Sequence, residues 1–358
     1  MSAQYGGSAE EASNYEYVTA RVSARRASLF DEDDYRKLVR MGTGEIARFM
    51  EETEYGREMN ALGARYSGVD LIEYALNRNL AKHFNDLLRW ATGEAYDYIA
   101  RYLRKFDAWN VKTALRGIYS EAGTEAIESD YIRAGEFDDT LLEQLARADS
   151  IESAVETLEQ TIFGDALRVA YDDYEETDLL VPLENAVDRV FFEDIDEGLP
   201  SRVQADRATE LYIEFITAEI DFSNARNALR LARSGADMDP AAYFIDGGRL
   251  FDAEELRQLV DSREQLIEHI RESVYGDDLA DALSEFEKSD DVVRFENVLD
   301  AALLAFADRL ANRYPPSVCS VLSYILAKER EVDNIRAIAR GREANLPPEE
   351  IETELVML

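Results

Sequence analysis

The sequence is organised by one pattern that recurs three times in the same order. The pattern consists of four short motifs, which we call anchors one to four, and each reappears about 110 residues further along the chain. Such a repeat restricts the fold strongly, because three copies of one sequence are expected to fold into three copies of one structural unit. We call these copies repeats one to three.

The first anchor reads FDEDDYRKL at 30–38, FDDTLLEQL at 137–145 and FDAEELRQL at 251–259. A Phe-Asp pair before apolar residues at helical spacing is typical of a helix start. We expect the aspartates to cap three helices, with the preceding phenylalanine packing as a hydrophobic staple. The capping residues are Asp31, Asp138 and Asp252.

The second anchor contains an aromatic-glycine pair, in ETEYGREM at 52–59, QTIFGDAL at 160–167 and ESVYGDDL at 272–279. Glycine inside a helix costs about 1 kcal/mol relative to alanine. Its recurrence therefore predicts a helix break, a kink or a close contact between helices.

The third anchor places a glutamate four residues before an asparagine or aspartate, in IEYALNRNL at 72–80, LENAVDRVF at 183–191 and FENVLDAAL at 295–303. An apolar residue precedes the glutamate, tyrosine or asparagine follows it, and two small or aliphatic residues come next.

The fourth anchor reads DAWNVKTALR at 107–116, DFSNARNALR at 221–230 and EVDNIRAIAR at 331–340. Its acid and asparagine share one helical stripe with small or aliphatic residues. We expect these polar groups to satisfy buried groups on neighbouring elements. The residues of this repeated motif are Asp107, Asn110, Asp221, Asn224, Glu331 and Asn334.

The opposite face of the fourth anchor carries two basic residues in each copy. They are Lys112, Arg116, Arg226, Arg230, Arg336 and Arg340. In one interpretation they form ion pairs with acids of the same domain, with Glu73, Glu184 and Glu296 as candidates. In the other, three symmetry-related basic pairs form a socket for an acidic or helix-ended partner.

Apolar residues recur at three- and four-residue spacing throughout, alternating strand patterns are missing, and the prolines fall at loops or helix starts. The pattern predicts an all-α fold of three homologous helical-bundle domains at 1–125, 126–240 and 241–358. Three such domains can stack in a line or close around a pseudo-threefold axis. Because solenoid units have about 20–45 residues, a compact trefoil or funnel fits at least as well.

The formal net charge is −36, from 75 acids against 39 bases, and the acids are spread along the whole chain. The bases are mostly arginine; the lysines are Lys37, Lys82, Lys105, Lys112, Lys288 and Lys328. Such a charge disfavours nucleic acid and anionic lipid as partners. Spread acid with little lysine is typical of a surface that stays hydrated in high salt, so we hypothesise a halophilic source.

No pattern points to catalysis, a metal or a cofactor. The two histidines, His83 and His269, occupy different places in their repeats. The stretch GTGE at 42–45 lacks the lysine and preceding strand of a phosphate loop, and we interpret it as a capped turn between helices. The single cysteine fits a reducing cytoplasm. We expect neither a signal peptide at the polar N-terminus nor a membrane span, since the longest apolar run covers only 301–307.

Three stretches resemble the C subunit of archaeal A-type and bacterial V/A-type rotary ATP synthases, a family whose eukaryotic counterpart is the d subunit of the vacuolar ATPase. The most specific is PPSVCSVLSYILAKEREVDNIRAIARGREANLPPEEIETELVML at 315–358. KFDAWNVKTALRG at 105–117 and YEYVTARVSARRASLF at 15–30 are similar to the family as well. The third repeat departs from the common motif only in carrying Glu331 where the other copies have aspartate.

The resemblance implies a funnel of three helical domains around a pseudo-threefold axis, without catalytic residues or cofactors. It implies a rotor protein, one copy per complex, on the cytoplasmic face of the membrane. There it would receive the D and F subunits of the central stalk, contact the membrane proteolipid ring, and carry torque between ion flow and ATP synthesis. The alternatives are a stand-alone acidic scaffold or adaptor with soluble partners, and an unrecognised enzyme.

Overall fold

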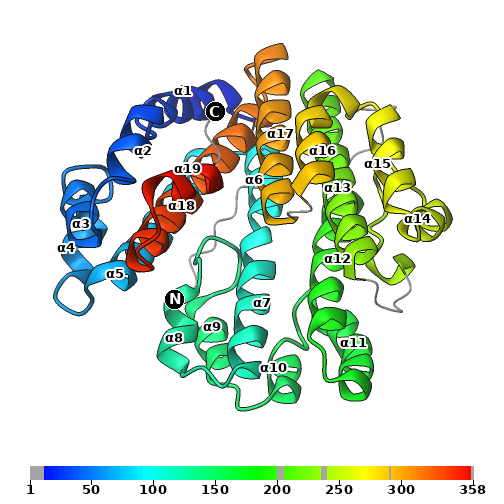
Figure 1. The fold of residues 1–358 in the computed structure, drawn as a ribbon, viewed down its shortest axis with the longest axis horizontal. Helices are drawn as coiled ribbons and strands as arrows, with labels where there is room; N and C mark the ends of the chain where they lie inside the picture. The colour runs from blue at the N-terminus through cyan, green and yellow to red at the C-terminus, as the bar shows by residue number, and fades with distance from the viewer. Residues whose placement is uncertain (1–11, 200–204, 235–239, 290–291, 356–358) are drawn as a thin grey trace. The chain divides into compact units, whose positions relative to one another are not determined.

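The computed structural model describes residues 12–199, 205–234, 240–289 and 292–355. Outside this range lie the first residues of the polar N-terminus, Pro200 and the last three residues of the family-like C-terminus. The described residues form helices and turns without a β-strand (Figure 1), and the predicted all-α class is confirmed.

The helices follow the three repeats in order. Repeat one contains α1 (Tyr15–Arg26), α2 (Glu32–Leu38), α3 (Thr43–Glu51), α4 (Gly56–Leu62), α5 (Gly68–Trp90), α6 (Glu94–Leu103) and α7 (Lys105–Tyr119). The next helices are α8 (Thr124–Asp130), α9 (Asp139–Ala146), α10 (Ile151–Thr157), α11 (Gly164–Thr177), α12 (Val181–Glu197) and α13 (Arg207–Ser234). The last are η1 (Pro240–Tyr243), α14 (Ala253–Val260), α15 (Arg263–Glu272), α16 (Gly276–Ser289), α17 (Val292–Arg313), α18 (Val318–Glu343) and α19 (Pro348–Glu354).

The chain divides into two compact units. Unit one comprises residues 1–187 and 324–358, and unit two comprises residues 188–323. Both boundaries fall inside long helices, α12 and α18. The division into three repeat domains therefore stays a prediction.

In unit one, the C-terminal part of α18 lies beside α5 (Figure 1), although about 260 residues separate them in the chain. The aliphatic stripe of α5, including Ile72 and Leu76, is fully buried, as are Ile335 and Ile338 of α18. Val111 of α7 is equally buried. Unit one therefore joins the first repeat to the end of the third.

In unit two, α13 packs against α17 and α15, and α17 packs against α16. The core includes Phe215 and Phe222 of α13, and Leu299 and Leu304 of α17, all almost completely buried. Tyr275, at the turn before α16, packs edge-on against Phe222 with ring centroids 5.1 Å apart. The second-anchor aromatic thus reaches the fourth-anchor helix of the preceding repeat.

The first anchors cap helices as the sequence predicts. The side chains of Asp31, Asp138 and Asp252 accept hydrogen bonds from the backbone N–H three residues later, at 3.0, 2.9 and 2.8 Å. Phe30 meets Tyr35 of α2 edge-on with centroids 6.3 Å apart, which is the predicted hydrophobic staple.

The glycines of the second anchors begin α4, α11 and α16 at close contacts with the preceding turn. A methyl group at Gly56, Gly164 or Gly276 would lie 2.3, 2.4 or 1.9 Å from the backbone oxygen five residues earlier. Of the three predicted roles, the structure shows a break between two helices with close packing of their ends.

Candidate functional site

The acid of each fourth anchor accepts hydrogen bonds from backbone N–H groups of the loop that leads into a first anchor. Asp107 of α7 accepts from the residues at 136 and 137, at 2.7 and 3.0 Å. Asp221 of α13 accepts from residues 249 and 250, at 2.6 and 2.8 Å. Glu331 of α18 accepts from the Phe30 N–H at 2.5 Å. The stripe acids are therefore internal hydrogen-bonding groups.

The asparagine three residues later binds the same loops through both functions of its amide. Asn110 donates to the Ile132 carbonyl and accepts from the Ile132 N–H, both at 2.9 Å. Asn224 pairs in the same way with Ile245, at 2.9 and 3.0 Å. Asn334 is also buried, at the corresponding place on α18.

The loops differ in how closely they approach the acid. A methyl group at Gly135 would lie 2.1 Å from an Asp107 carboxylate oxygen, and one at Gly248 would lie 2.3 Å from that of Asp221. The loop at Phe30 carries Ser28 and Leu29 instead of a glycine. Glutamate has one more methylene than aspartate, so it reaches a backbone that cannot approach as closely. This pairing of loop and acid explains the departure at position 331.

The contacts follow one order along the sequence. The fourth-anchor helix of repeat one holds the loop of repeat two, that of repeat two holds the loop of repeat three, and that of repeat three holds the loop of repeat one. Each contact lies within one of the two units. The repeats are therefore connected in a cyclic order.

The basic face follows the same cyclic order. The second arginine of each copy forms an ion pair with the third-anchor glutamate of the next repeat: Arg116 with Glu184, Arg230 with Glu296, and Arg340 with Glu73. The acids named by the sequence are the partners, but they belong to the next repeat and not to the same one. The physical reason is that the basic face of each fourth-anchor helix meets the third-anchor helix that follows it in this order.

The first basic residue of each copy is half-buried, whereas the second is exposed. Arg226 pairs with Asp300, and Arg336 donates to the Asn77 side chain at 2.8 Å. Lys112 occupies the matching position on α7. The side chains of Arg116, Arg230 and Arg340 are 55%, 54% and 64% exposed while they pair with their glutamates. Their guanidinium groups can therefore meet a partner without leaving these pairs.

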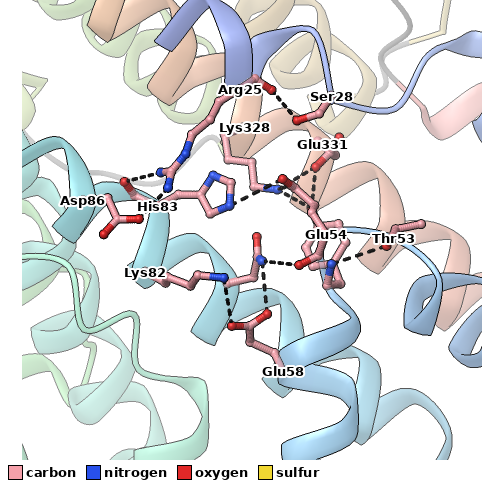
Figure 2. Close-up of polar contacts among 12 residues, drawn as sticks. Arg25, Ser28, Thr53, Glu54, Glu58, Lys82, His83, Asp86, Lys328 and Glu331 are labelled. Carbon is pink, nitrogen blue, oxygen red and sulfur yellow. Dashed lines mark hydrogen bonds and ion pairs between the residues drawn. The ribbon is translucent and has the colours of Figure 1, made fainter. Parts of the chain in front are cut away.

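The third-to-first junction carries a buried ionic cluster (Figure 2). Among the described residues, the other two junctions hold no buried lysine or arginine. Lys328 of α18 is completely buried and donates to Glu331 at 2.7 Å and to the Tyr55 hydroxyl at 2.8 Å. It also pairs with Glu54. Burial raises the pKa of the Glu54 carboxyl, and the positive charge of Lys328 offsets only part of that rise. The Tyr55 hydroxyl in turn donates to Glu331 at 2.5 Å.

His83 of α5 completes one side of this cluster. Its Nδ1 lies 2.5 Å from the Tyr324 hydroxyl and its Nε2 lies 3.5 Å from a Glu54 oxygen. Burial, together with the nearby charges of Lys328 and Arg25, lowers the pKa of His83 to about 2. The imidazole is therefore neutral at physiological pH and acts as a hydrogen-bonding group in the core.

Other features that could suggest chemistry have structural explanations. His269 lies 2.7 Å from the Leu250 carbonyl through Nε2. The stretch at 42–45 is the start of α3, where Glu45 accepts from the Gly42 N–H at 2.9 Å, so the predicted capped turn is confirmed. Among the described residues, no cluster of histidine, cysteine, aspartate or glutamate could hold a metal ion. Within the same residues, no helix is both long and apolar enough to cross a membrane.

The comparisons with known proteins decide the family. The model of the ATP synthase (C/AC39) subunit matches residues 18–354. The chain belongs to the ATP synthase C/AC39 subunit family. The C subunit of the A-type ATP synthase of Haloferax volcanii is 63% identical over 97% of this chain and 98% of its own length. The corresponding C subunits of Halobacterium salinarum and Methanosarcina mazei are 57% and 32% identical, over 98% and 97% of this chain.

Membership of the C/AC39 family confirms the resemblance seen in the sequence and makes the chain part of an ATP synthase complex. The family is a structural rotor component and not the catalytic one, so the enzyme alternative is wrong. Relatives from salt-loving archaea agree with the halophilic origin proposed from the acidic composition.

Sequence reasoning missed the buried cluster of this C/AC39 family member. Lys328 stands three residues before the stripe acid, where the other copies carry Arg104 and Ala218. A lysine in the apolar run ahead of Glu331 was the available signal. Glu54 gave a second signal, since it replaces Ile162 and Val274 before the second-anchor aromatic.

Proposed function

We propose that this chain is the socket of the central rotor of an A-type ATP synthase. In this function it joins the central stalk, formed by the D and F subunits, to the membrane proteolipid ring. It rotates with both as one copy per complex at the cytoplasmic face of the membrane. Torque passes through it between ion transport and ATP synthesis.

The cyclic order of the repeat contacts supports this proposal most. Three homologous units whose junctions follow a cycle fit a pseudo-threefold, funnel-shaped arrangement of domains at 1–125, 126–240 and 241–358. Such an arrangement can be centred on the rotation axis of a ring. A linear stack would leave the first and last repeats without a mutual junction, whereas here Glu331 binds Phe30.

The repeated basic face is our candidate for contact with the stalk. Its second arginines are half-exposed although they are paired, in all three copies. In a chain of net charge −36, repeated exposed arginines are suited to recognising an acidic surface. The proposed partner-binding residues are Lys112, Arg116, Arg226, Arg230, Arg336 and Arg340.

Affinity isolation of the tagged chain from detergent-solubilised membranes tests the function. We expect the D and F subunits, the proteolipid ring and the nucleotide-binding subunits to co-isolate at fixed stoichiometry, with one copy of this chain. Recovery of the chain as a free monodisperse protein, with the complex intact elsewhere in the gradient, would contradict the socket assignment.

A further inference from the structure

A pocket of about 360 Å³ opens in unit one between α5, α7, α8 and the C-terminal part of α18. Its wall on α7 is one helical face that carries Trp109, Thr113 and Arg116. Arg336 and Arg340 contribute from α18. The pocket therefore lies beside the third-to-first junction and includes two of the exposed arginines described above.

Trp109 is an unusual residue at this place. The residue is 43% exposed, whereas the corresponding positions of the other repeats carry the polar residues Ser223 and Asp333. Tryptophan and arginine are the residues most enriched at energetic centres of protein interfaces. Tryptophan buries a large apolar area, and its indole N–H keeps a hydrogen bond available. A half-exposed tryptophan next to arginines is thus suited to anchoring a protein partner.

The charge of the pocket differs from that of the whole chain. Its lining holds Arg116, Arg336 and Arg340 against the carboxylates of Glu73 and Asp130. Arg340 contacts Glu73 through Nε and Nη2, and its side chain remains 64% exposed. Arg116 and Arg336 also have carboxylate partners, in Glu184 and Asp333. Because the Arg116 and Arg340 side chains stay 55% and 64% exposed in their pairs, a carboxylate of a partner can make a further contact with both.

We propose that this pocket is the specific docking point for one acidic segment of the central stalk. The segment places an apolar side chain against the Trp109 ring and a carboxylate between Arg116 and Arg340. The proposal rests on the proposed function and deepens it, because it assigns the strongest stalk contact to one side of the pseudo-threefold set. The asymmetry of Trp109 gives the stalk a single rotational register on an otherwise repeated surface.

Fluorine NMR of the intact chain tests this directly. The chain has two tryptophans, Trp90 and Trp109. The variant Trp90→Phe keeps a ring beneath Arg21 and Arg25, which lie 4.8 and 4.4 Å from the Trp90 ring centroid. Labelled with 5-fluorotryptophan, it gives one resonance, from Trp109. We expect that resonance to shift on addition of unlabelled D–F complex and to stay in place on addition of solubilised proteolipid ring.

A binding titration with matched variants provides the second test. We expect Trp109→Ala to weaken D–F binding at least tenfold and Trp109→Phe to weaken it less than threefold. Ile162→Ala is the control, since Ile162 has the same 43% exposure outside the pocket and should change affinity less than twofold.

The docking point would be overturned if Trp109→Ala bound the D–F complex with wild-type affinity, or if the fluorine resonance shifted only with the proteolipid ring. The socket function would still stand in either case if the D and F subunits co-isolate with the chain. Failure of D–F to co-isolate at all would remove both proposals. If Trp109→Ala does not fold, the fluorine measurement on the native side chain decides.

Discussion

Two junctions of this protein bind the loop of the next repeat with different side chains. At the second-to-third junction, Asp221 binds a glycine loop only 29 residues away, and the residue three positions before it is Ala218. At the third-to-first junction, Glu331 binds Phe30 across 301 residues, and the preceding turn carries the buried Lys328. The same hydrogen-bonding motif thus serves a local contact and a very distant one.

The difference follows from chain entropy. Closing a loop of about 301 residues costs about 2 kcal/mol more than closing one of 29 residues, if both behave as flexible chains. The distant junction also lacks a glycine that would let its backbone approach. Added ionic and hydrogen-bonding contacts from Lys328, Glu54 and Tyr55 are positioned to offset that cost. The comparison suggests that the closing junction is the most specialised of the three.

Removing the buried lysine should have the largest effect on this comparison. Lys328→Met removes the buried cation that pairs with both Glu54 and Glu331, so we expect a loss of about 3–5 kcal/mol in the free energy of unfolding. Denaturant unfolding in molar salt, followed by circular dichroism, measures it. Adding Glu331→Gln to the same chain should recover part of the loss.

Lys37→Met is the matched control, because Lys37 pairs with Asp34 on the exposed face of α2 and solvent screening leaves such a pair little effect on stability. A Lys328→Met chain as stable as this control would mean that the cluster does not stabilise the closing junction.

The first-to-second junction should respond to pH because its acid has no buried lysine. Burial, only partly offset by the backbone N–H groups of residues 136 and 137, raises the pKa of Asp107 to about 7. A raised carboxyl pKa means that the folded state holds the proton more tightly. The stability contributed by Asp107 is therefore present below about pH 4 and lost as the pH rises to about 7, by up to ~1.4 kcal/mol per pH unit.

Denaturant unfolding of wild type and Asp107→Asn at several pH values between 4 and 7 checks this. The asparagine variant is less stable at low pH, but its free energy of unfolding should lack the part of the fall with pH that Asp107 causes. Parallel slopes for the two proteins would show that Asp107 does not titrate in this range.

Substitution in a glycine loop tests whether a glycine is needed for the close approach of that loop to the acid. Gly135→Ala places a methyl group 2.1 Å from Asp107, so we expect a loss of about 1–3 kcal/mol from overpacking and backbone displacement. Gly44→Ala, inside α3 and with no atom within 4 Å of the new methyl, serves as the control and should lose no stability. Thermal unfolding of both variants gives the difference, and equal melting temperatures would refute the close-approach explanation.

The sequence predicted most of the fold because the features that determine it are local or repeated. The caps at Asp31, Asp138 and Asp252 depend on neighbouring residues, and the helical period depends on spacing alone. The repeat also identified the stripe and its candidate acids. It could not say which repeat supplies each partner, because Arg116 reaches Glu184 across a contact made only in three dimensions.

The buried cluster around Lys328 could not be predicted from the sequence, for a related reason. Lys328 breaks the repeat, so comparison of the three copies gives no partner for it. Its role depends on Glu54, which lies 274 residues away and is equally peculiar to one copy. The pairing of two such residues can be seen only when the fold brings the first repeat into contact with the third.

The smallest stability change is expected at the exposed ion pairs. Changing these pairs separates two roles of the arginines, pairing with glutamates inside the chain and contact with the stalk. We expect Arg230→Glu alone to cost about 0.5–1 kcal/mol, since the Arg230 side chain is 54% exposed. Exchanging the pair, as Arg230→Glu with Glu296→Arg, should restore most of that loss. The exchange nevertheless moves the positive charge from α13 to α17. If the arginines contact the stalk, the exchanged chain should bind the D–F complex more weakly despite its recovered stability.

Making the same exchange at Arg116 with Glu184 and at Arg340 with Glu73 extends the test to all three junctions. The control exchanges Arg207 and Glu210, an exposed pair on α13 outside the repeated motif. Wild-type D–F affinity after the triple exchange would assign the arginines to internal pairing alone. Weaker binding with unchanged helicity would mean that one face of the fourth anchor joins the repeats to one another and joins the rotor to its stalk, because the pairs leave the guanidinium groups half exposed.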